Sequence, residues 1–590
     1  MKKSRLLVVV LFVICIFLYV NSIVLPLTKG YEYFTEFAAD LINKKQRLPS
    51  IRSVVPPKRF EFIKQIAYLT GIILCGLFAL AIYYATSLSK YLIALLKRVI
   101  ISWGSFISAI RATDRVAKFT LILTIFYLVV QSLWYMNELP FLHDEAYTIS
   151  NFILPGPLAS ISFYPYPNNH ILFSLLSYPF SFLPVKPEIA YRLPSLIAVV
   201  FTCLALFRLL LLFLKGHIAA LGVVMFICML PVMNYAIFAR GYSLVFLFSC
   251  LSIFALIRII EDPSCYHYAL LVLFSILGLY TIPSYMYPFA TIYTIAFGHA
   301  VLERSRRIIF RYVVSGLICS IGTLILYLPV IITSGGWKDF LHVLYFGYDH
   351  TSTITKIRYF IDSVYALQFF ENNLLVILFF LYTAVAASVV IKKNFGMKVP
   401  LKESFFFCIC LLGFLTPLIS FLLQRKMIAP RTHSYAAVFL VGFIFISLKQ
   451  LVNQKWRQIA FIGITAFIIT MNIAYAHRSI LLKGEAYNDK SADIFAQEML
   501  KGPKGSDTCY TFDIFYLANI QLKYAFEHRP LFVYQSQPGS PSSATFDFNN
   551  KYNWIITMKE DFTLNRDSLN RYYVAHIDRK DAVLWKRKYL

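Results

Sequence analysis

Residues 117–137 have the sequence AKFTLILTIFYLVVQSLWYMN, in which Lys118 is the one charged residue. A helix of about 20 mainly apolar residues matches the thickness of the hydrocarbon layer of a bilayer. Trp134 and Tyr135 near the end of the run suit the membrane interface, where a ring with one polar edge contacts both phases. The polar sequence FLHDEAY follows at 141–147. This stretch therefore predicts a transmembrane helix that leads directly into an acidic loop.

Similar apolar runs recur along most of the chain. Of its 590 residues, 58% are hydrophobic and 15% are charged, whereas soluble proteins carry about 25% charged residues. This composition excludes a string of water-soluble domains and predicts an all-α polytopic membrane protein with about 13 transmembrane helices. The predicted spans are 6–28, 63–86, 117–137, 190–213, 218–238, 242–260, 267–282, 284–302, 309–332, 367–391, 403–423, 433–450 and 456–476.

The net charge of +26 is unevenly distributed. Residues 478–590 hold 16 Lys or Arg against 13 Asp or Glu, a net +3, so the remainder lies among the apolar runs. Short basic clusters beside apolar runs are typical of the cytoplasmic ends of membrane helices. A nucleic-acid partner is not predicted, because such binding favours a continuous basic stripe.

The distribution of basic residues also predicts the topology. The loop 138–169 contains no Lys or Arg, which places it outside the cytoplasm, and the odd span count then places the C-terminus outside as well. We expect a multi-pass protein of the cell membrane with three parts: an N-terminal module with two transmembrane helices (1–116), a transmembrane catalytic core (117–476) and an extracytoplasmic domain (477–590). The basic loop 29–62 does not fit this scheme, and its topology stays open.

The C-terminal part has the pattern of a small α/β domain. Residues 491–500 predict an amphipathic helix, and residues 508–516, 531–534 and 552–558 predict strands. Two further short strands, 572–577 and 582–586, predict a hairpin.

The acidic loop supplies the candidate catalytic residues. Asp144 and Glu145 are adjacent carboxylates in a loop free of cations, and a carboxylate there can accept a proton from a hydroxyl or amine. It can also bind a divalent cation through oxygen ligands, although no Asp-x-Asp sequence or metal-ligand set is present. His170 follows a Pro- and Asn-rich turn and can contact a phosphate or assist proton transfer. The alternatives are solvated loop charges and a helix start capped by Asn169.

Several cations lie at the predicted outer ends of spans, against the positive-inside tendency. Guanidinium groups bind phosphate through paired hydrogen bonds, so these cations are candidates for a phosphate site; the alternative is contact with lipid headgroups. The candidate phosphate-binding residues are Arg240, Tyr242, Arg425, Lys426 and Arg431. Arg192 is a similar outer cation.

The order of these motifs resembles the GT-C superfamily of polytopic glycosyltransferases. The chain is most similar to bacterial members related to dolichyl-phosphate-mannose protein mannosyltransferases and lipid A aminoarabinose transferases. The motifs that carry the resemblance are Asp144-Glu145, Asn169-His170, Ala190-Tyr191-Arg192-Leu193-Pro194-Ser195, Arg240-Gly241-Tyr242 and the loop from Arg425 to Arg431. Two features depart from the family pattern: Ile171 stands where the family often has Pro, and the N-terminal module is additional.

The resemblance implies a hexosyl- or pentosyltransferase that moves a sugar from a polyprenyl-phosphate donor to a lipid, glycan or protein acceptor at the outer face. It implies that Asp144 is the base or orients the acceptor, that Glu145 is its companion, and that Arg240 and the Arg425–Arg431 loop bind the donor phosphate. A transporter or flippase of a polyprenyl-linked glycan and a non-catalytic assembly subunit stay open as alternatives. The sugar, the acceptor, the stereochemical outcome and the oligomeric state do not follow from the sequence.

Overall fold

The structure is a computed structural model of the full chain. It describes residues 9–10, 13, 16–17, 19–20, 24–41, 56–83, 97, 101, 104–162, 164, 168–333, 373–395, 400–424, 429–476, 484–502, 507–511, 514–527, 529, 531–535, 552–558, 566–579 and 582–588.

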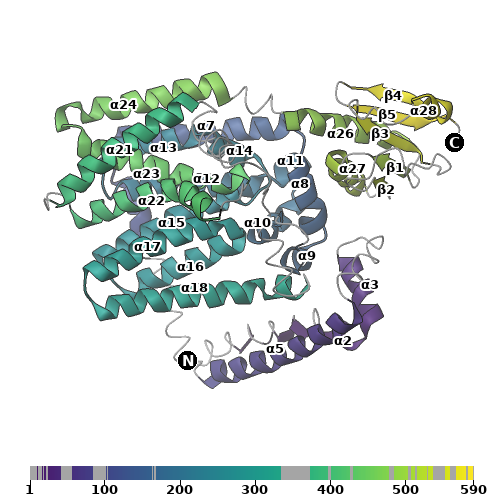
Figure 1. The fold of residues 1–590 in the computed structure, drawn as a ribbon, viewed down its shortest axis with the longest axis horizontal. Coiled ribbons are helices and arrows are strands. Elements are labelled where there is room, and N and C mark those ends of the chain that lie inside the picture. The colour runs from purple at the N-terminus through teal and green to yellow at the C-terminus, as the bar shows by residue number, and fades with distance from the viewer. Residues whose placement is uncertain are drawn as a thin grey trace.

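A bundle of long helices makes up most of the molecule (Figure 1). Its helices are α7 (Arg115–Glu138), α12 (Leu193–Leu210), α13 (Gly216–Ile227), α14 (Leu230–Ile237), α15 (Tyr242–Glu261), α16 (Cys265–Thr281), α17 (Met286–Leu302), α18 (Arg306–Thr333), α21 (Asn373–Phe395), α22 (Leu401–Gln424), α23 (Ala436–Leu451) and α24 (Gln454–Met471). Helix α15 is largely buried among its neighbours, whereas most of α7 faces outward, as expected for an inner and an outer helix of a membrane bundle.

Short elements connect the long helices. They are α8 (His143–Thr148), η3 (Ile149–Ile153), α9 (Pro157–Ser162), α10 (Ile171–Ser177), η4 (Tyr178–Phe182), α11 (Pro187–Ala190), η5 (Pro283–Tyr285), η8 (Pro430–His433) and η9 (Asn472–Ala476). Six of them, from α8 to α11, lie between α7 and α12, so this one connection supplies most of the irregular structure at that end of the bundle.

Among the described residues, seven helices are long and apolar enough to cross a membrane, and an eighth span results if α13 and α14, bent by 69°, count as one. The seven are Arg115–Glu138, Pro187–Leu210, Tyr242–Glu261, Arg306–Ile331, Asn373–Val390, Leu401–Leu423 and Gln454–Ala474. The chain is therefore a mostly helical polytopic membrane protein.

The sequence predicted more spans than these. Three of the predicted segments are the helices α16, α17 and α23, which have only 17, 17 and 16 residues. A helix of that length extends about 25 Å, less than the roughly 30 Å hydrocarbon layer. Predicted span 63–86 overlaps α5 (Pro57–Tyr83) up to Tyr83, where that helix ends. Of the 23 residues in predicted span 6–28, 11 lie outside the described residues. The count of about 13 stays a prediction.

The C-terminal α/β unit, from α26 (Gly484–Leu500) to β5, contains one five-stranded sheet in the order β2-β1-β3-β5-β4. Its other elements are β1 (Asp507–Thr511), α27 (Ile514–Phe526), β2 (Leu531–Gln535), β3 (Trp554–Met558), α28 (Arg566–Tyr572), β4 (Tyr573–Asp578) and β5 (Ala582–Arg587). Strands β1, β2 and β3 pair in parallel, and β3, β5 and β4 pair in antiparallel fashion.

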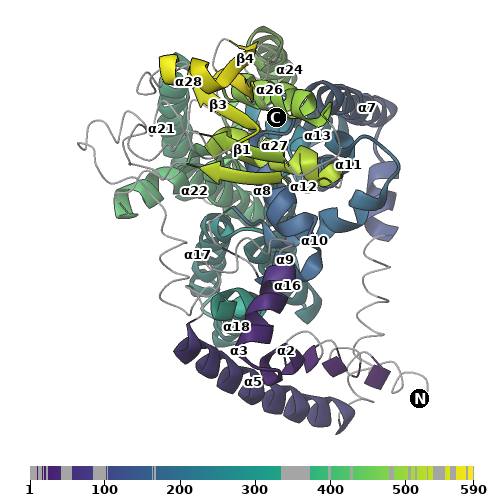
Figure 2. The ribbon, with the colours of Figure 1, turned by 90° about the vertical axis from the view of Figure 1, so that its right-hand side faces the viewer.

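The predicted hairpin of β4 and β5 is confirmed, as are the strands β2 and β3 and the helix over 491–500. The predicted strand 508–516 was wrong at its end, because β1 stops at Thr511 and α27 begins at Ile514. The apolar and aromatic start of α27 resembles a strand, while its burial follows a helical spacing: Ala518 and Leu522, four residues apart, both pack into the main core. In Figure 2 this unit faces the viewer, with α27 over α8.

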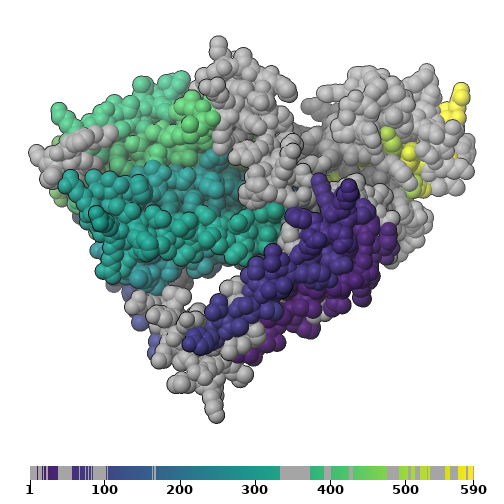
Figure 3. All heavy atoms as spheres, turned by 60° about the horizontal axis from the view of Figure 1, so that its bottom comes forward, coloured from purple at the N-terminus to yellow at the C-terminus, as the bar shows by residue number. Residues whose placement is uncertain are grey.

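The N-terminal helices form a small cluster of their own. Leu27 lies in α2 (Leu25–Thr28), the short helix before α3 (Tyr31–Leu41). It packs against Phe60, Ile63 and Ala67 of α5. The space-filling view shows these helices as purple atoms beside the teal helices of the bundle (Figure 3). None of the candidate site residues comes from this part of the chain.

Candidate active site

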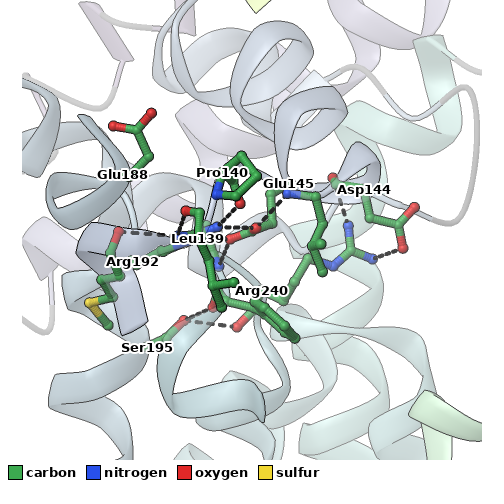
Figure 4. A network of polar contacts seen from close by, with 12 residues as sticks. Leu139, Pro140, Asp144, Glu145, Glu188, Arg192, Ser195 and Arg240 are labelled. Carbon is green, nitrogen blue, oxygen red and sulfur yellow. Dashed lines mark hydrogen bonds and ion pairs between the residues drawn. The ribbon is translucent and has the colours of Figure 1, made fainter. Parts of the chain in front are cut away.

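Four of the segments that the sequence analysis singled out meet at one end of the bundle. They are α8, which follows α7; the turn before α10; the start of α12; and the turn between α14 and α15. A fifth segment, η8 before α23, adds Arg431. All of them except the turn before α10, which joins two short helices, lie at an end of a long helix of the bundle. Figure 4 shows polar contacts among side chains of several of these segments.

Glu145 and Arg192 form a fully buried ion pair. Arg192 Nε donates to Glu145 Oε1 at 2.9 Å, and Arg192 Nη2 donates to Glu145 Oε2 at 2.7 Å. Glu145 also accepts hydrogen bonds from the backbone amides of Leu142 and Ala239, at 2.8 and 2.6 Å. The Glu145 side chain is 1% exposed and the Arg192 side chain is 0% exposed. Both carboxylate oxygens are therefore fully used within the protein.

The rest of the Arg192 guanidinium holds the end of α7. Its Nη1 donates to the carbonyl of Leu139 at 2.8 Å, and its Nη2 donates to the carbonyl of Pro140 at 2.7 Å. Ser195, one turn further along α12, donates to the carbonyl of Phe238 at 2.6 Å. These contacts tie the acidic loop and the turn after α14 to the start of α12 (Figure 4).

Asp144, next to Glu145, has a different environment. Its side chain is 32% exposed, and its Oδ2 lies 3.7 Å from Arg240 Nη2 and 3.4 Å from Arg431 Nη2. Asn168 Nδ2 donates to its Oδ1 at 3.5 Å. The two guanidinium groups approach the carboxylate without forming short, paired hydrogen bonds, so Asp144 keeps acceptor capacity for a ligand.

The charges around Asp144 favour its ionised form. Burial raises the pKa of its carboxyl group, but the guanidinium groups of Arg240 and Arg431 outweigh that effect, with a smaller contribution from His143. The pKa of Asp144 is therefore held below its usual value, and the carboxylate is charged at neutral pH.

His170 is a buried, neutral imidazole. The backbone amide of Gly241 donates to His170 Nδ1 at 2.7 Å, so Nδ1 is unprotonated and the proton of the neutral ring belongs on Nε2. Burial lowers the pKa of His170 well below its usual value, and the nearby Arg240 and Arg431 lower it further. Its Nε2 lies 3.4 Å from Arg240 Nη2. These two nitrogens, both donors in this protonation state, therefore lie close together, and such a pair suits an anionic oxygen.

Arg240 is positioned by several contacts. Its Nη1 donates to the hydroxyl of Thr148 at 3.0 Å and to the carbonyl of Asp144 at 3.2 Å. Its guanidinium lies 6.0 Å from the centre of the Tyr242 ring, which meets the His170 ring edge-on at 4.9 Å. With a side chain that is only 4% exposed, Arg240 is a fixed positive charge.

Of the predicted site residues, Asp144, Glu145, His170, Arg240, Tyr242 and Arg431 come together here. Arg425 and Lys426 lie outside the described residues, so their predicted role stays a prediction. Four residues of this region were not among the predicted catalytic or phosphate-binding residues: Thr148, Asn168, Ser195 and Gly241. Ser195 and Gly241 belong to the motifs that carry the family resemblance, while Thr148 and Asn168 had no signal beyond their proximity to such motifs, because a Ser, Thr, Asn or Gly in a turn is common without any function.

A divalent cation beside Asp144 was left open by the sequence. Two guanidinium groups lie within 3.7 Å of this carboxylate. In the described part of the chain, no three His, Cys, Asp or Glu side chains form a cluster that could hold a metal ion. Fixed positive charges at this distance repel a further cation. The residues present therefore do not fit a divalent metal.

Comparison with solved structures finds a related fold. ArnT from Cupriavidus metallidurans bound to undecaprenyl phosphate matches with a TM-score of 0.50 and 10% sequence identity, covering 79% of this chain and 97% of ArnT. The same protein in the apo state matches with a TM-score of 0.42 and 9% identity, covering 80% and 98%. No protein-family model and no curated protein matches the sequence. The predicted resemblance to lipid A aminoarabinose transferases is thus confirmed as a similarity of fold to ArnT.

Proposed function

We propose that this protein is a membrane glycosyltransferase that moves a sugar from a polyprenyl-phosphate donor to a lipid, glycan or protein acceptor at the outer face of the membrane. The observation that carries the proposal is the ionised Asp144 carboxylate held beside two guanidinium groups at one end of a transmembrane bundle. The similarity of fold to a protein that binds undecaprenyl phosphate supports the class of donor.

In this proposal the donor phosphate is bound by Arg240, Arg431 and His170. Arg240 and His170 place Nη2 and Nε2 3.4 Å apart, a spacing at which one phosphate oxygen can accept from both. Arg431 is 48% exposed, so it can move to a second phosphate oxygen. Positive groups here stabilise the charge that grows on the phosphate as it leaves. Tyr242 supports the position of Arg240 and His170.

Asp144 is the catalytic base in this proposal. The acceptor hydroxyl or amine transfers its proton to the carboxylate while its oxygen or nitrogen bonds to the anomeric carbon of the sugar. The bond from that carbon to the phosphate oxygen breaks, and polyprenyl phosphate leaves with the electron pair. Because the pKa of Asp144 is lowered, the carboxylate is in the proton-accepting form at neutral pH.

Glu145 has a positioning role here rather than the catalytic one first considered. Its oxygens already accept four hydrogen bonds from Arg192 and the backbone, so they have no capacity left for a substrate. Glu145 holds α8 against α12 and the turn after α14, and it thereby fixes the position of Asp144.

The proposal is tested by incubating the purified protein in detergent with a radiolabelled polyprenyl-phosphate sugar and candidate acceptors. We expect wild type to transfer the label and Asp144→Asn to lose about 10²- to 10⁴-fold in rate. The matched control is Glu138→Gln, which removes an exposed carboxylate at the end of α7 and should leave transfer unchanged. Normal transfer by Asp144→Asn would exclude the carboxylate as the base. A wild-type protein that transfers no label in detergent but translocates the donor across the membrane of reconstituted vesicles would favour a flippase.

A further inference from the structure

The C-terminal α/β unit contacts the catalytic loop directly through one helix. Helix α27 packs against both α8 and η3. Its Ala518 and Leu522, which are 6% and 1% exposed, belong to the hydrophobic core of the transmembrane bundle rather than to the core of the sheet. This helix is therefore shared between the two parts of the molecule.

A charged contact fixes one side of α27. Lys523 Nζ donates to Glu188 Oε1 of α11 at 2.9 Å and lies 2.8 Å from Asp493 Oδ1 of α26. The Lys523 side chain is 22% exposed and that of Glu188 is 6% exposed, so water screens the pair less than it would screen a surface pair. Lys523 thus bridges a carboxylate of the α/β unit and a carboxylate of the bundle.

An aromatic contact fixes the end of α27 above the catalytic loop. The Phe526 ring stacks on Tyr191, with centroids 6.0 Å apart and planes at 19°, and it lies 6.3 Å from Phe141. Phe141 in turn lies under the guanidinium of Arg192 at 5.0 Å. Phe526 therefore packs on Tyr191, which precedes Arg192 in the chain, and on Phe141, whose ring contacts the Arg192 guanidinium.

From these contacts we infer that α27 of the C-terminal α/β unit holds α8 in the orientation that presents Asp144, with Lys523 and Phe526 as positioning residues. The inference rests on the proposed function for its catalytic consequence. It assigns to this unit a role in positioning the active site, distinct from binding an acceptor or a partner. Neither residue touches Asp144, Arg240 or His170 in the described contacts, so an effect on catalysis is indirect, and the packing of α27 on α8 supplies the route.

The test compares Phe526→Ala and Lys523→Met with wild type in two assays. Hydrogen–deuterium exchange of the backbone amides of residues 142–148 reports whether α8 is held, and it needs no substrate. Steady-state transfer from the labelled donor separates kcat from KM. We expect faster exchange in both variants and a fall in kcat of on the order of tenfold to a hundredfold, with an unchanged KM for the donor, because the phosphate contacts are not altered.

Two further variants control for folding and residue type. Lys501→Met removes an exposed ion pair of the same unit, whose lysine is 72% exposed, and should change neither assay. Phe526→Leu keeps part of the apolar contact and should restore part of kcat. Unchanged exchange in both test variants would overturn the inference, as would faster exchange with a wild-type kcat. If exchange is faster in the two variants but the wild-type protein transfers no sugar, the contact made by α27 is upheld and the proposed function is overturned instead.

Discussion

Asp144 and Glu145 are chemically similar neighbours with opposite environments. Glu145 is buried and accepts four short hydrogen bonds, whereas Asp144 is one-third exposed and lies 3.4 and 3.7 Å from its two guanidinium partners. Successive residues of a helix point about 100° apart, so the Glu145 carboxylate faces the interior of the bundle while the Asp144 carboxylate is partly exposed. The four hydrogen bonds of Glu145 stabilise the fold, while the looser contacts of Asp144 leave its carboxylate able to act on a substrate.

The largest expected effect on stability comes from breaking the buried ion pair of Glu145 and Arg192. Arg192→Met leaves the Glu145 carboxylate buried without its partner, which should lower the free energy of unfolding by about 3–5 kcal/mol. Thermal unfolding of the purified protein in detergent measures the change. The matched control is Arg258→Met, which breaks an Arg–Glu pair that is 37% and 23% exposed and should cost about 1 kcal/mol or less. Equal destabilisation by the two variants would contradict a special role for the buried pair.

A smaller effect is expected at the contact between Gly241 and His170. A Cβ added at Gly241 would lie 2.8 Å from Thr281 Cγ2 and 3.0 Å from His170 Cβ, so Gly241→Ala must displace the amide that donates to His170 Nδ1. We expect a loss of about 1–3 kcal/mol of stability and a raised KM for the donor. In Gly298→Ala an added Cβ meets nothing within 4 Å, and this control should unfold at or above the wild-type temperature.

The smallest effect is expected for the exposed partner of Asp144. Arg431→Gln should raise KM for the donor roughly two- to tenfold, because the lost group is half-exposed. It should also raise the pKa of Asp144, whose present value Arg431 lowers. Since the base works in its ionised form, the acidic limb of the kcat/KM profile should move to higher pH. An acidic limb that stays in place, or moves to lower pH, would contradict the assignment of Asp144 as the titrating base.

Most of the fold class could be predicted from the sequence, because apolar runs of membrane length have a strong signal. The predicted spans 267–282 and 284–302 also separate at Pro283, where η5 lies between α16 and α17. The number and bounds of the membrane spans were harder to predict, since a 17-residue apolar helix packed inside a bundle has the same composition as one that crosses the bilayer. Helix α27 was not predicted, because its first residues Ile514, Phe515 and Tyr516 favour a strand by propensity.

Most residues that meet at the candidate site were named by the sequence analysis, but the division of roles proposed for them was not. The acidic loop, His170 and the outer cations were recognised by residue type and position relative to the apolar runs. Adjacent residues in a short loop carry no information on which one turns inward, and the ion pair that decides the matter joins Glu145 to Arg192, 47 positions later in the chain. Similarly, nothing near Phe526 indicates that it packs on Phe141.

The division of roles between the two carboxylates is tested most directly by comparing Asp144→Asn and Glu145→Gln in one preparation, with the transfer rate and the unfolding temperature measured for each. We predict that Asp144→Asn loses about 10²- to 10⁴-fold in transfer and unfolds at the wild-type temperature. Glu145→Gln should unfold at a clearly lower temperature, because it leaves the Arg192 charge buried without a counter-charge. Retained transfer by Asp144→Asn, or wild-type unfolding of Glu145→Gln, would contradict the account.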